Sequence, residues 1–223
     1  MNEMGRLQIE VYSDTICPWC FIGKRRFEKA LIERAEVDFE LTWMPFQLNP
    51  DMPPEGMDRG EYLSLKFGGA ERAQDIYTPI EEAGAHEGIE FQFKAMQRTP
   101  NTLGSHRLIH YARDQTQGQD AVVEALFAAY FSRGENIGDV DVLVDCAAAA
   151  GMEPSTVREY LESETDIPQI QAQDAMARQM GIQGVPFFVF ARKYAVSGAQ
   201  SPEVFVNVFD TLREEATAIG VSE

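Results

Sequence analysis

Two cysteines separated by two residues, in the run Cys17-Pro18-Trp19-Cys20, are the side chains of this sequence best suited to chemistry. An apolar–polar alternation at residues 7–12 precedes them and predicts a half-buried strand. The apolar spacing that follows predicts a helix beginning at or just after Cys17. A helix N-terminus carries unpaired N–H groups and about half a positive charge, so it favours a thiolate, which is the nucleophilic form of cysteine. Pro18 suits the first helical turn because it has no N–H to lose.

Structural zinc binding and a permanent disulfide are the two other uses of such a cysteine pair. Zinc in structural sites usually takes four ligands, often from two such pairs, and the one further cysteine in the sequence is Cys146. The histidines, His86, His106 and His110, do not form a ligand pair close to it. A permanent disulfide would need an oxidising compartment. Redox chemistry of the pair is therefore favoured, and no metal site is expected.

The composition indicates a chain that can build its own core. Its 223 residues, of which 44% are hydrophobic, suffice for one large domain or two small ones. The first six residues contain no apolar stretch of the kind found in secretory signals, and no run of about 18 apolar residues predicts a transmembrane helix. These features favour the cytoplasm, where the disulfide of a Cys-x-x-Cys pair is transient and catalytic.

The charge is strongly acidic, with 19 basic residues, 36 acidic residues and a net charge of −17. Nucleic acids and anionic membranes require a basic face, so neither is expected as a partner. Lysine is scarce, at 5 residues against 14 arginines. An acidic, lysine-poor surface fits a salt-rich cytosol, and an ordinary acidic protein is an equally good interpretation.

The first half of the sequence predicts a compact unit followed by helices. Alternation at residues 37–43 predicts a second strand, and the resulting β-α-β unit implies a parallel pair with a right-handed crossover. Residues 58–164 then have helical character. Within them, Pro79 is expected to end or kink the helix that begins at Ala70, and residues 89–93 are expected to form a short extended segment.

The last part of the sequence returns to mixed structure. Asp166 is expected to cap a helix that runs to Met180. An apolar strand at residues 185–190 follows, with Pro186 at its entry, where the missing N–H is tolerated. Residues 191–197 complete a hairpin, and an amphipathic helix ends the chain. The predicted order is β-α-β, a helical block, and then α-β-β-α.

This order, with Cys-x-x-Cys after the first strand and a proline entering the third, resembles a thioredoxin fold with a large helical insertion. The sequence is similar to the DsbA-like superfamily and, within it, to the cytoplasmic FrnE-like branch. The segments that carry the resemblance are Ser13–Lys24, Asn101-Thr102 with His106-Arg107, Gly184–Phe188 and Val196–Gln200. The resemblance spans nearly the whole chain. It implies an α/β class, with a thioredoxin-like domain at residues 1–57 and 165–223 and an inserted all-helical domain at residues 58–164.

The resemblance also implies a thiol–disulfide oxidoreductase or isomerase. Cys17 would be the attacking thiol and Cys20 the resolving thiol. Pro186 resembles the family's cis-proline, which faces the redox pair and leaves the backbone of Val185 free for an extended substrate. The expected partners are a disulfide-containing protein or a low-molecular-weight thiol or disulfide. No cofactor beyond the redox-active disulfide is expected, and glutathione is a candidate co-substrate. The protein is expected to be a monomer or a homodimer.

Further residues are candidates for contact with a substrate. Pro18 and Trp19 lie between the cysteines, where Trp19 offers an apolar contact. The resemblance makes Asn49, Asn101 and His106 candidates for lining the cleft, although the residue pattern alone favours a structural histidine at His106.

Two more side chains have alternative interpretations. Asp14 precedes Cys17 by three residues and either accepts a proton near Cys20 or, as we favour, forms local hydrogen bonds in the turn. Cys146 lies in an alanine-rich helical segment and is expected to be buried and inert.

Two other classes of function compete with disulfide exchange. The same superfamily contains kappa-class glutathione transferases and 2-hydroxychromene-2-carboxylate isomerases, which act on small aromatic compounds and typically have serine at the first active-site position. This sequence has cysteine at both positions. A non-catalytic chaperone or binding module is the second alternative, and it would function without either cysteine.

Overall fold

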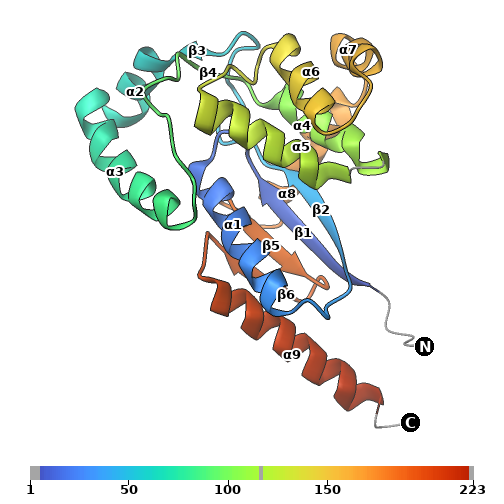
Figure 1. Cartoon of the computed structure of the whole chain (residues 1–223). Helices are drawn as coiled ribbons and strands as arrows, with labels where there is room; N and C mark the ends of the chain where they lie inside the picture. The colour runs from blue at the N-terminus through green and yellow to red at the C-terminus, as the bar shows by residue number, and fades with distance from the viewer. Residues whose placement is uncertain (1–5, 116–117, 221–223) are drawn as a thin grey trace.

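A four-stranded sheet in the order β2-β1-β5-β6 organises the first and last parts of the chain (Figure 1). The structure, a computed structural model, describes residues 6–115 and 118–220. The strands are β1 (Leu7–Ser13), β2 (Phe39–Pro45), β5 (Phe187–Phe190) and β6 (Tyr194–Ser197). The observed order of elements confirms the predicted α/β class.

The first β-α-β unit forms as predicted. Helix α1 (Pro18–Glu33) connects β1 to β2, and the two strands pair in parallel along their whole length. β2 begins at Phe39 rather than at Val37, because the Val37 N–H still closes the turn after α1 by donating to the Arg34 carbonyl.

The hairpin of β5 and β6 is also confirmed. β5 pairs antiparallel with both β1 and β6, so β1 lies between a parallel and an antiparallel neighbour. β5 begins at Phe187, later than the predicted start at residue 185, because Pro186 has no N–H to donate to the strand ladder.

Helices cover both faces of this sheet (Figure 1). α1 and the C-terminal helix α9 (Pro202–Gly220) lie on one face, and α8 (Ile167–Gln179) lies against the other. The alternation of β1 divides its side chains between these layers. Ile9 and Val11 point into the main core, and Tyr12 joins a smaller cluster under α8.

Aromatic rings fill the space between α1, the sheet and α9. The ring of Phe27 lies 5.4 Å from that of Phe188 and 5.5 Å from that of Phe205. Phe188 and Phe205 meet edge to face at 4.8 Å. Aromatic rings favour such edge contacts, which add to the free energy of burial.

A block of helices lies beyond the end of the sheet at which β1 leads into α1 (Figure 1). Its helices are α2 (Arg59–Phe67), α3 (Ala70–His86), α4 (Leu103–Tyr111), α5 (Gly118–Phe127), α6 (Val140–Ala149) and α7 (Pro154–Glu162), with a 3-10 turn (Ala112–Asp114) and a π-helical turn (Ala128–Ser132). The block also contains a two-stranded sheet that the sequence did not predict, made of β3 (Met57–Asp58) and β4 (Arg98–Thr99).

Of the two alternatives for Pro79, a helix end is wrong, because α3 continues to His86, and Ala73 and Ile80 on either side of the proline are both buried in the block. The segment at residues 89–93 belongs to no sheet. Their apolar side chains are instead held by other aromatic rings, and Phe91, for example, stacks on Phe93 at 4.8 Å.

Asp166 is the N-cap residue of α8 and Met180 its C-cap residue, as predicted. Asp166 has a φ of 64°, however, and its side chain makes no capping hydrogen bond. Its carboxylate accepts a 2.9 Å hydrogen bond from the Tyr160 hydroxyl instead. The residue therefore ties the start of α8 to α7, which is a contact that local sequence does not reveal.

A buried lysine joins α1 to α5. The Lys24 ammonium forms ion pairs with Glu28 of α1 and with Asp120 and Glu124 of α5, the last two at 3.1 Å. Burial lowers the pKa of Lys24, but these carboxylates outweigh it and raise the pKa above its usual value. The lysine thus stays charged and holds the helical block against α1.

Gln119 of α5 makes a second link, to β2. Its side-chain carbonyl accepts a 2.9 Å hydrogen bond from the Trp43 N–H. Its side-chain NH₂ donates to the carbonyls of Trp43 at 3.2 Å and Ile109 at 3.1 Å. One buried amide therefore connects β2, α4 and α5.

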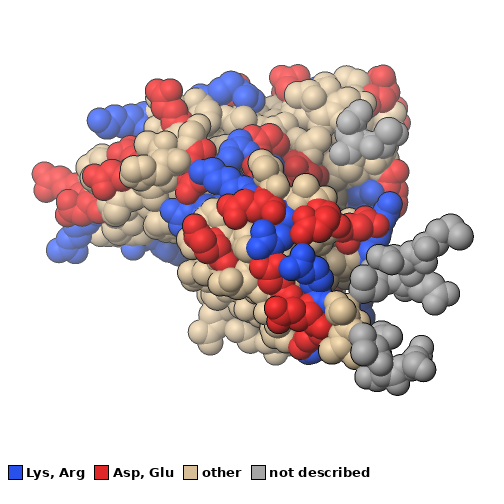
Figure 2. All heavy atoms as spheres, turned by 60° about the horizontal axis from the view of Figure 1, so that its bottom comes forward, with Lys and Arg blue, Asp and Glu red and all other residues tan. Residues whose placement is uncertain are grey.

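The surface mixes charges of both signs on the face shown in Figure 2. Ion pairs join neighbouring elements, such as Arg34 of α1 with Asp210 of α9 at 2.7 Å and Lys193 with Glu215 of α9 at 2.6 Å. The acidic excess therefore does not form an unbroken patch on this face. Among the described helices, none is long and apolar enough to cross a membrane.

The aromatic core predicts a large effect of Phe27→Ala. Phe27 is 2% exposed, so the substitution should lower the free energy of unfolding by about 3–5 kcal/mol. Ile32→Ala is the matched control, because Ile32 lies on the same helix and is 77% exposed. Denaturant unfolding measures both variants, and equal losses would contradict this description of the core.

Candidate active site

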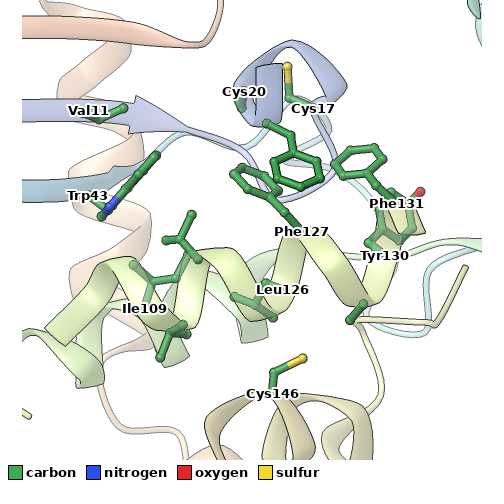
Figure 3. Packing of buried hydrophobic residues seen from close by; sticks show 14 of the residues in the cluster. Val11, Cys17, Cys20, Trp43, Ile109, Leu126, Phe127, Tyr130, Phe131 and Cys146 are labelled. Atoms are coloured by element: carbon green, nitrogen blue, oxygen red, sulfur yellow. The ribbon is translucent and has the colours of Figure 1, made fainter. Parts of the chain in front are cut away.

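The cysteine pair lies where β1 turns into α1 (Figure 3). Cys17 is the N-cap residue with an extended backbone, and Pro18 occupies the first helical turn, as predicted. The Cys17 N–H donates to the Asp14 carbonyl, and the Cys20 N–H donates to the Cys17 carbonyl, both at 3.0 Å. Both thiols are free and buried. The turn thus places Cys17 at the positive end of the helix dipole.

The environment of Cys20 keeps its thiol protonated. Cys20 is 1% exposed. Burial raises the pKa of this thiol well above its usual value, and the neighbouring Cys17 sulfur raises it further. Hydrogen bonds from the Ser13 hydroxyl and the Asp14 backbone N–H act in the opposite direction. Cys20 is therefore a buried thiol that holds its proton.

Val185 and Pro186 face this pair from a segment 168 residues further along the chain. The peptide bond between them is cis, as the resemblance implies. The Cys17 thiol lies 3.5 Å from the Val185 carbonyl oxygen, to which it donates. The Pro186 carbonyl accepts a 2.8 Å hydrogen bond from the Gly198 N–H. The loop is thus held between the hairpin and the Cys17 sulfur.

Gly23 of α1 permits the close approach of this loop. A Cβ atom at residue 23 would lie 2.8 Å from Cγ of Pro186 and 3.5 Å from Cβ of Ala199. Contacts under about 3 Å are too short for carbon atoms. Glycine inside a helix lowers its stability, so its presence there is a sequence signal of close packing that the sequence interpretation missed.

Apolar side chains are exposed beside the cysteine turn. Trp19 is 38% exposed, and Leu48, in the loop after β2, is 37% exposed. Leu48 is tied to the turn because its N–H donates to Oδ2 of Asp14 at 2.6 Å. An apolar surface is therefore exposed beside the cysteine turn.

Asp14 and His106 form a buried pair behind the turn. Asp14 is 0% exposed and His106 is 3% exposed. His106 Nε2 lies 3.4 Å from Asp14 Oδ1, and neither atom has a hydrogen-bond partner among the described residues. The expected local role of the Asp14 side chain is wrong, because its other oxygen bonds Leu48 far along the chain.

Asn49 and Asn101 lie near one groove, away from any described contact with the cysteines. Asn49 pairs with the Tyr62 hydroxyl and the Lys66 ammonium, each at 3.4 Å. Asn101 donates to the Met52 carbonyl at 2.6 Å and so holds the loop after β2. The groove has a volume of about 360 Å³ and is lined by residues 48–53, Met57, Tyr62, Leu65 and Lys66.

The structure thus divides the predicted site residues into groups. It brings Cys17, Cys20, Val185 and Pro186 together, with Pro18 and Trp19 in the same turn. It places His106 behind them, Asn49 in the lining of the groove, and Asn101 in a hydrogen bond to Met52 of that lining. Ser13 is a contact of the Cys20 sulfur that the sequence interpretation missed. Strand alternation places Ser13 on the same face of β1 as Val11, two residues earlier, and this pattern could have predicted that Ser13 faces α1.

Cys146 lies apart from the site, on α6 below α5 (Figure 3). Its thiol is buried and lies 3.6 Å from the Ala125 carbonyl oxygen. Burial raises its pKa to about 12. These properties agree with the predicted inert thiol. Within residues 6–115 and 118–220, no group of three or more His, Cys, Asp or Glu side chains is arranged to hold a metal ion.

Known proteins share this architecture. The DSBA-like thioredoxin domain family matches residues 8–210. The protein YwbO of Bacillus subtilis is 30% identical over 201 residues, which cover 89% of this chain and 94% of that protein. The crystal structure of the probable DsbA oxidoreductase SCO1869 from Streptomyces coelicolor is 32% identical, with a TM-score of 0.84 and coverage of 94% of this chain and 91% of that one.

A more distant neighbour is similar in fold alone. It is the cytosolic disulfide reductase DsbM from Pseudomonas aeruginosa, solved with GSH, at 16% identity and a TM-score of 0.63. The match covers 93% of this chain and 99% of that chain. All these matches include both the sheet and the helical block.

The three thiols should differ in reactivity. In the reduced protein at about pH 8, iodoacetamide is expected to modify Cys17 and to leave Cys20 and Cys146 largely unmodified, since raised pKa values keep both protonated. Peptide mass spectrometry measures the modification, and denatured protein is the control in which all three react. Native alkylation of Cys146 at the denatured rate would contradict this assignment.

The contact between Gly23 and Pro186 predicts that Gly23→Ala is harmful. The added methyl group would push the proline loop away from α1, at a loss of about 1–3 kcal/mol of unfolding free energy. Gly184→Ala is the matched control, because a Cβ at Gly184 meets nothing within 4 Å. Denaturant unfolding compares the two, and an unchanged midpoint in Gly23→Ala would show that the contact is not needed.

Proposed function

The chain belongs to the DSBA-like thioredoxin domain family, and from this membership we propose that it catalyses thiol–disulfide exchange through Cys17 and Cys20. The observation that carries the proposal is the position of Cys17, at the start of α1 and 3.5 Å from the carbonyl oxygen of the cis-proline loop. The buried, protonated Cys20 in the next turn is the partner that such a reaction requires.

The reaction has two steps. Cys17 thiolate attacks one sulfur of a substrate disulfide, forms a mixed disulfide and releases the first substrate thiolate, which takes a proton from solvent. Cys20 then loses its proton and attacks the Cys17 sulfur, which releases the second substrate thiol. The substrate disulfide gains two electrons, and the enzyme dithiol loses the same two as it becomes the Cys17–Cys20 disulfide. The reverse sequence oxidises a dithiol.

The loop before β5 supports binding of an extended substrate. Val185 presents its backbone beside Cys17, where a peptide segment could align as an additional strand. Trp19 and Leu48 add exposed apolar surface next to the reacting sulfur. The proposed substrates are therefore disulfide-containing proteins, with low-molecular-weight disulfides as a second group.

The proposed place in the cell is the cytoplasm, within the FrnE-like branch of the family. A cytoplasmic thiol pool sustains reduction or isomerisation more readily than net oxidation, so we propose these directions. Glutathione is the proposed co-substrate that returns the enzyme disulfide to the dithiol. The solved DsbM, a cytosolic disulfide reductase with GSH, supports this choice through its fold.

Serine substitutions test the proposed roles. Cys17→Ser should abolish reduction of a single-disulfide peptide, because no nucleophile remains at the helix N-terminus. Cys20→Ser should accumulate a mixed disulfide that mass spectrometry detects, because the resolving thiol is missing. Cys146→Ser is the matched control and should retain exchange.

Two outcomes would contradict this proposal. Full thiol–disulfide exchange by Cys17→Ser would show that Cys17 is not the attacking thiol. Activity on a small aromatic compound that requires added glutathione and survives Cys20→Ser would favour the isomerase or transferase class instead.

A further inference from the structure

We infer that Arg26 of α1 is a positioning residue for polypeptide substrates, because its guanidinium holds in place the loop that carries Val185 and Pro186. The inference rests on the proposed exchange reaction and extends it to residues outside the cysteine turn. The Val196–Gln200 segment carries part of the family resemblance and takes no part in the proposed chemistry. Its contact with Arg26 gives this segment a supporting role.

Arg26 connects two distant parts of the chain. Its Nη1 donates a 2.6 Å hydrogen bond to the carbonyl oxygen of Ala199, in the turn after β6. Its Nε donates at 2.7 Å to Oε1 of Glu87, the C-cap residue of α3. A guanidinium is planar and holds its N–H groups in a fixed fork, so a bond at one nitrogen fixes the direction of the others. The Ala199 carbonyl is therefore held at a defined position relative to α1.

Glu87, the anchor of this arginine, is itself fixed. Its side chain is 8% exposed, and its Oε2 accepts a 2.6 Å hydrogen bond from the Lys29 ammonium. Burial favours the protonated acid, but Lys29 and Arg26 hold the pKa of Glu87 below its usual value. The end of α3 lies beside α1 (Figure 1). Arg26 is thus anchored by a charge-assisted bond to the helical block, and such bonds are stronger than neutral ones.

The turn at Ala199 supports the proline loop from behind. The N–H of Gly198, the residue before Ala199, donates to the Pro186 carbonyl at 2.8 Å. Gly198 has a φ of 81°, a conformation that favours glycine, and the Gln200 N–H donates to the Gly198 carbonyl at 3.0 Å. Because the turn is this tight, a restraint on the Ala199 carbonyl also restrains Pro186.

Helix α1 therefore holds the same loop at two points. Gly23, three residues before Arg26, leaves room for Pro186 to lie against the helix. Gly23 determines how closely the loop approaches α1, and Arg26 determines where along α1 the loop lies. With both contacts made, the Val185 carbonyl oxygen lies 3.5 Å from the Cys17 sulfur.

The position of this loop matters to one class of substrate. An extended polypeptide can pair with the backbone at Val185 as an added strand, and that pairing requires the loop to lie in a fixed place beside Cys17. A small disulfide has no backbone to pair and needs the Cys17 sulfur alone. Loss of Arg26 should therefore slow exchange with peptides and leave exchange with small disulfides unchanged.

Two disulfides separate these contributions in single-turnover experiments with the reduced enzyme. One is a single-disulfide peptide whose two halves carry a fluorophore and a quencher. The other is 5,5′-dithiobis(2-nitrobenzoate), which has no peptide backbone. Arg26→Met is expected to lower the second-order rate constant for the peptide about tenfold, the size expected for loss of one charge-assisted hydrogen bond. The rate constant for the small disulfide is expected to keep its wild-type value.

Arg25→Met is the matched control. Arg25 is the neighbouring residue on α1 and is 26% exposed, against 22% for Arg26, but it pairs with Glu124 of α5. This variant should keep the wild-type rate constants for both disulfides. Glu87→Ala removes the anchor and should reproduce the selective loss, even where Arg26→Met fails to fold. The double variant should lose no more than Arg26→Met alone, because both substitutions break one connection.

Three outcomes would overturn the inference. The first is a wild-type rate constant for the peptide in both Arg26→Met and Glu87→Ala. The second is an equal loss with the two disulfides, which would show that Arg26 acts on the Cys17 thiolate or on the fold as a whole. The third is a wild-type enzyme that does not cleave the peptide, which would contradict the proposed exchange function itself and is distinct from the first two.

Discussion

The pairing of β1 with β5 is the constraint on which the rest of the structure depends. β1 ends at the cysteine turn, β5 begins after the cis-proline loop, and their antiparallel register brings these two ends together. The Cys17 sulfur and the Val185 carbonyl thereby meet across 168 positions of sequence. β1 pairs with β2 on one side and with β5 on the other, and the chain between β2 and β5 leaves the sheet and returns through α8. The helical block consequently lies beyond the end of the sheet that carries the thiols.

Helix α1 is fixed on three sides, which matters because it carries both cysteines. Phe27 packs into the aromatic layer under α9, Gly23 contacts the proline loop, and Lys24 binds the carboxylates of α5. Each contact uses a different kind of interaction. Together they hold the Cys17 sulfur in place, which the proposed exchange reaction requires because the orientation of a nucleophile governs the rate of its reaction.

Sequence reasoning succeeded where the relevant contacts are local. Strand alternation, the position of Pro18 and the cysteine spacing all act within a few residues, so β1, α1 and the thiol turn could be predicted. The cis peptide bond at Pro186 and its position beside the cysteines could be predicted only from the family resemblance. The Asp14–His106 pair and the β3–β4 sheet depend on contacts between distant segments, which periodicity does not report. Pro79 failed as a helix end because burial on both sides outweighed its local effect.

Gln119 also affects how the sheet meets other chains. The outer edge of a sheet exposes N–H and carbonyl groups with which a strand from another molecule can pair, and aggregation often begins there. At Trp43 the amide of Gln119 bonds both of these groups, as a neighbouring strand would. The opposite edge belongs to β6, which is only four residues long. One edge of the sheet is therefore capped at Trp43 by a side chain of α5, and the other edge is short.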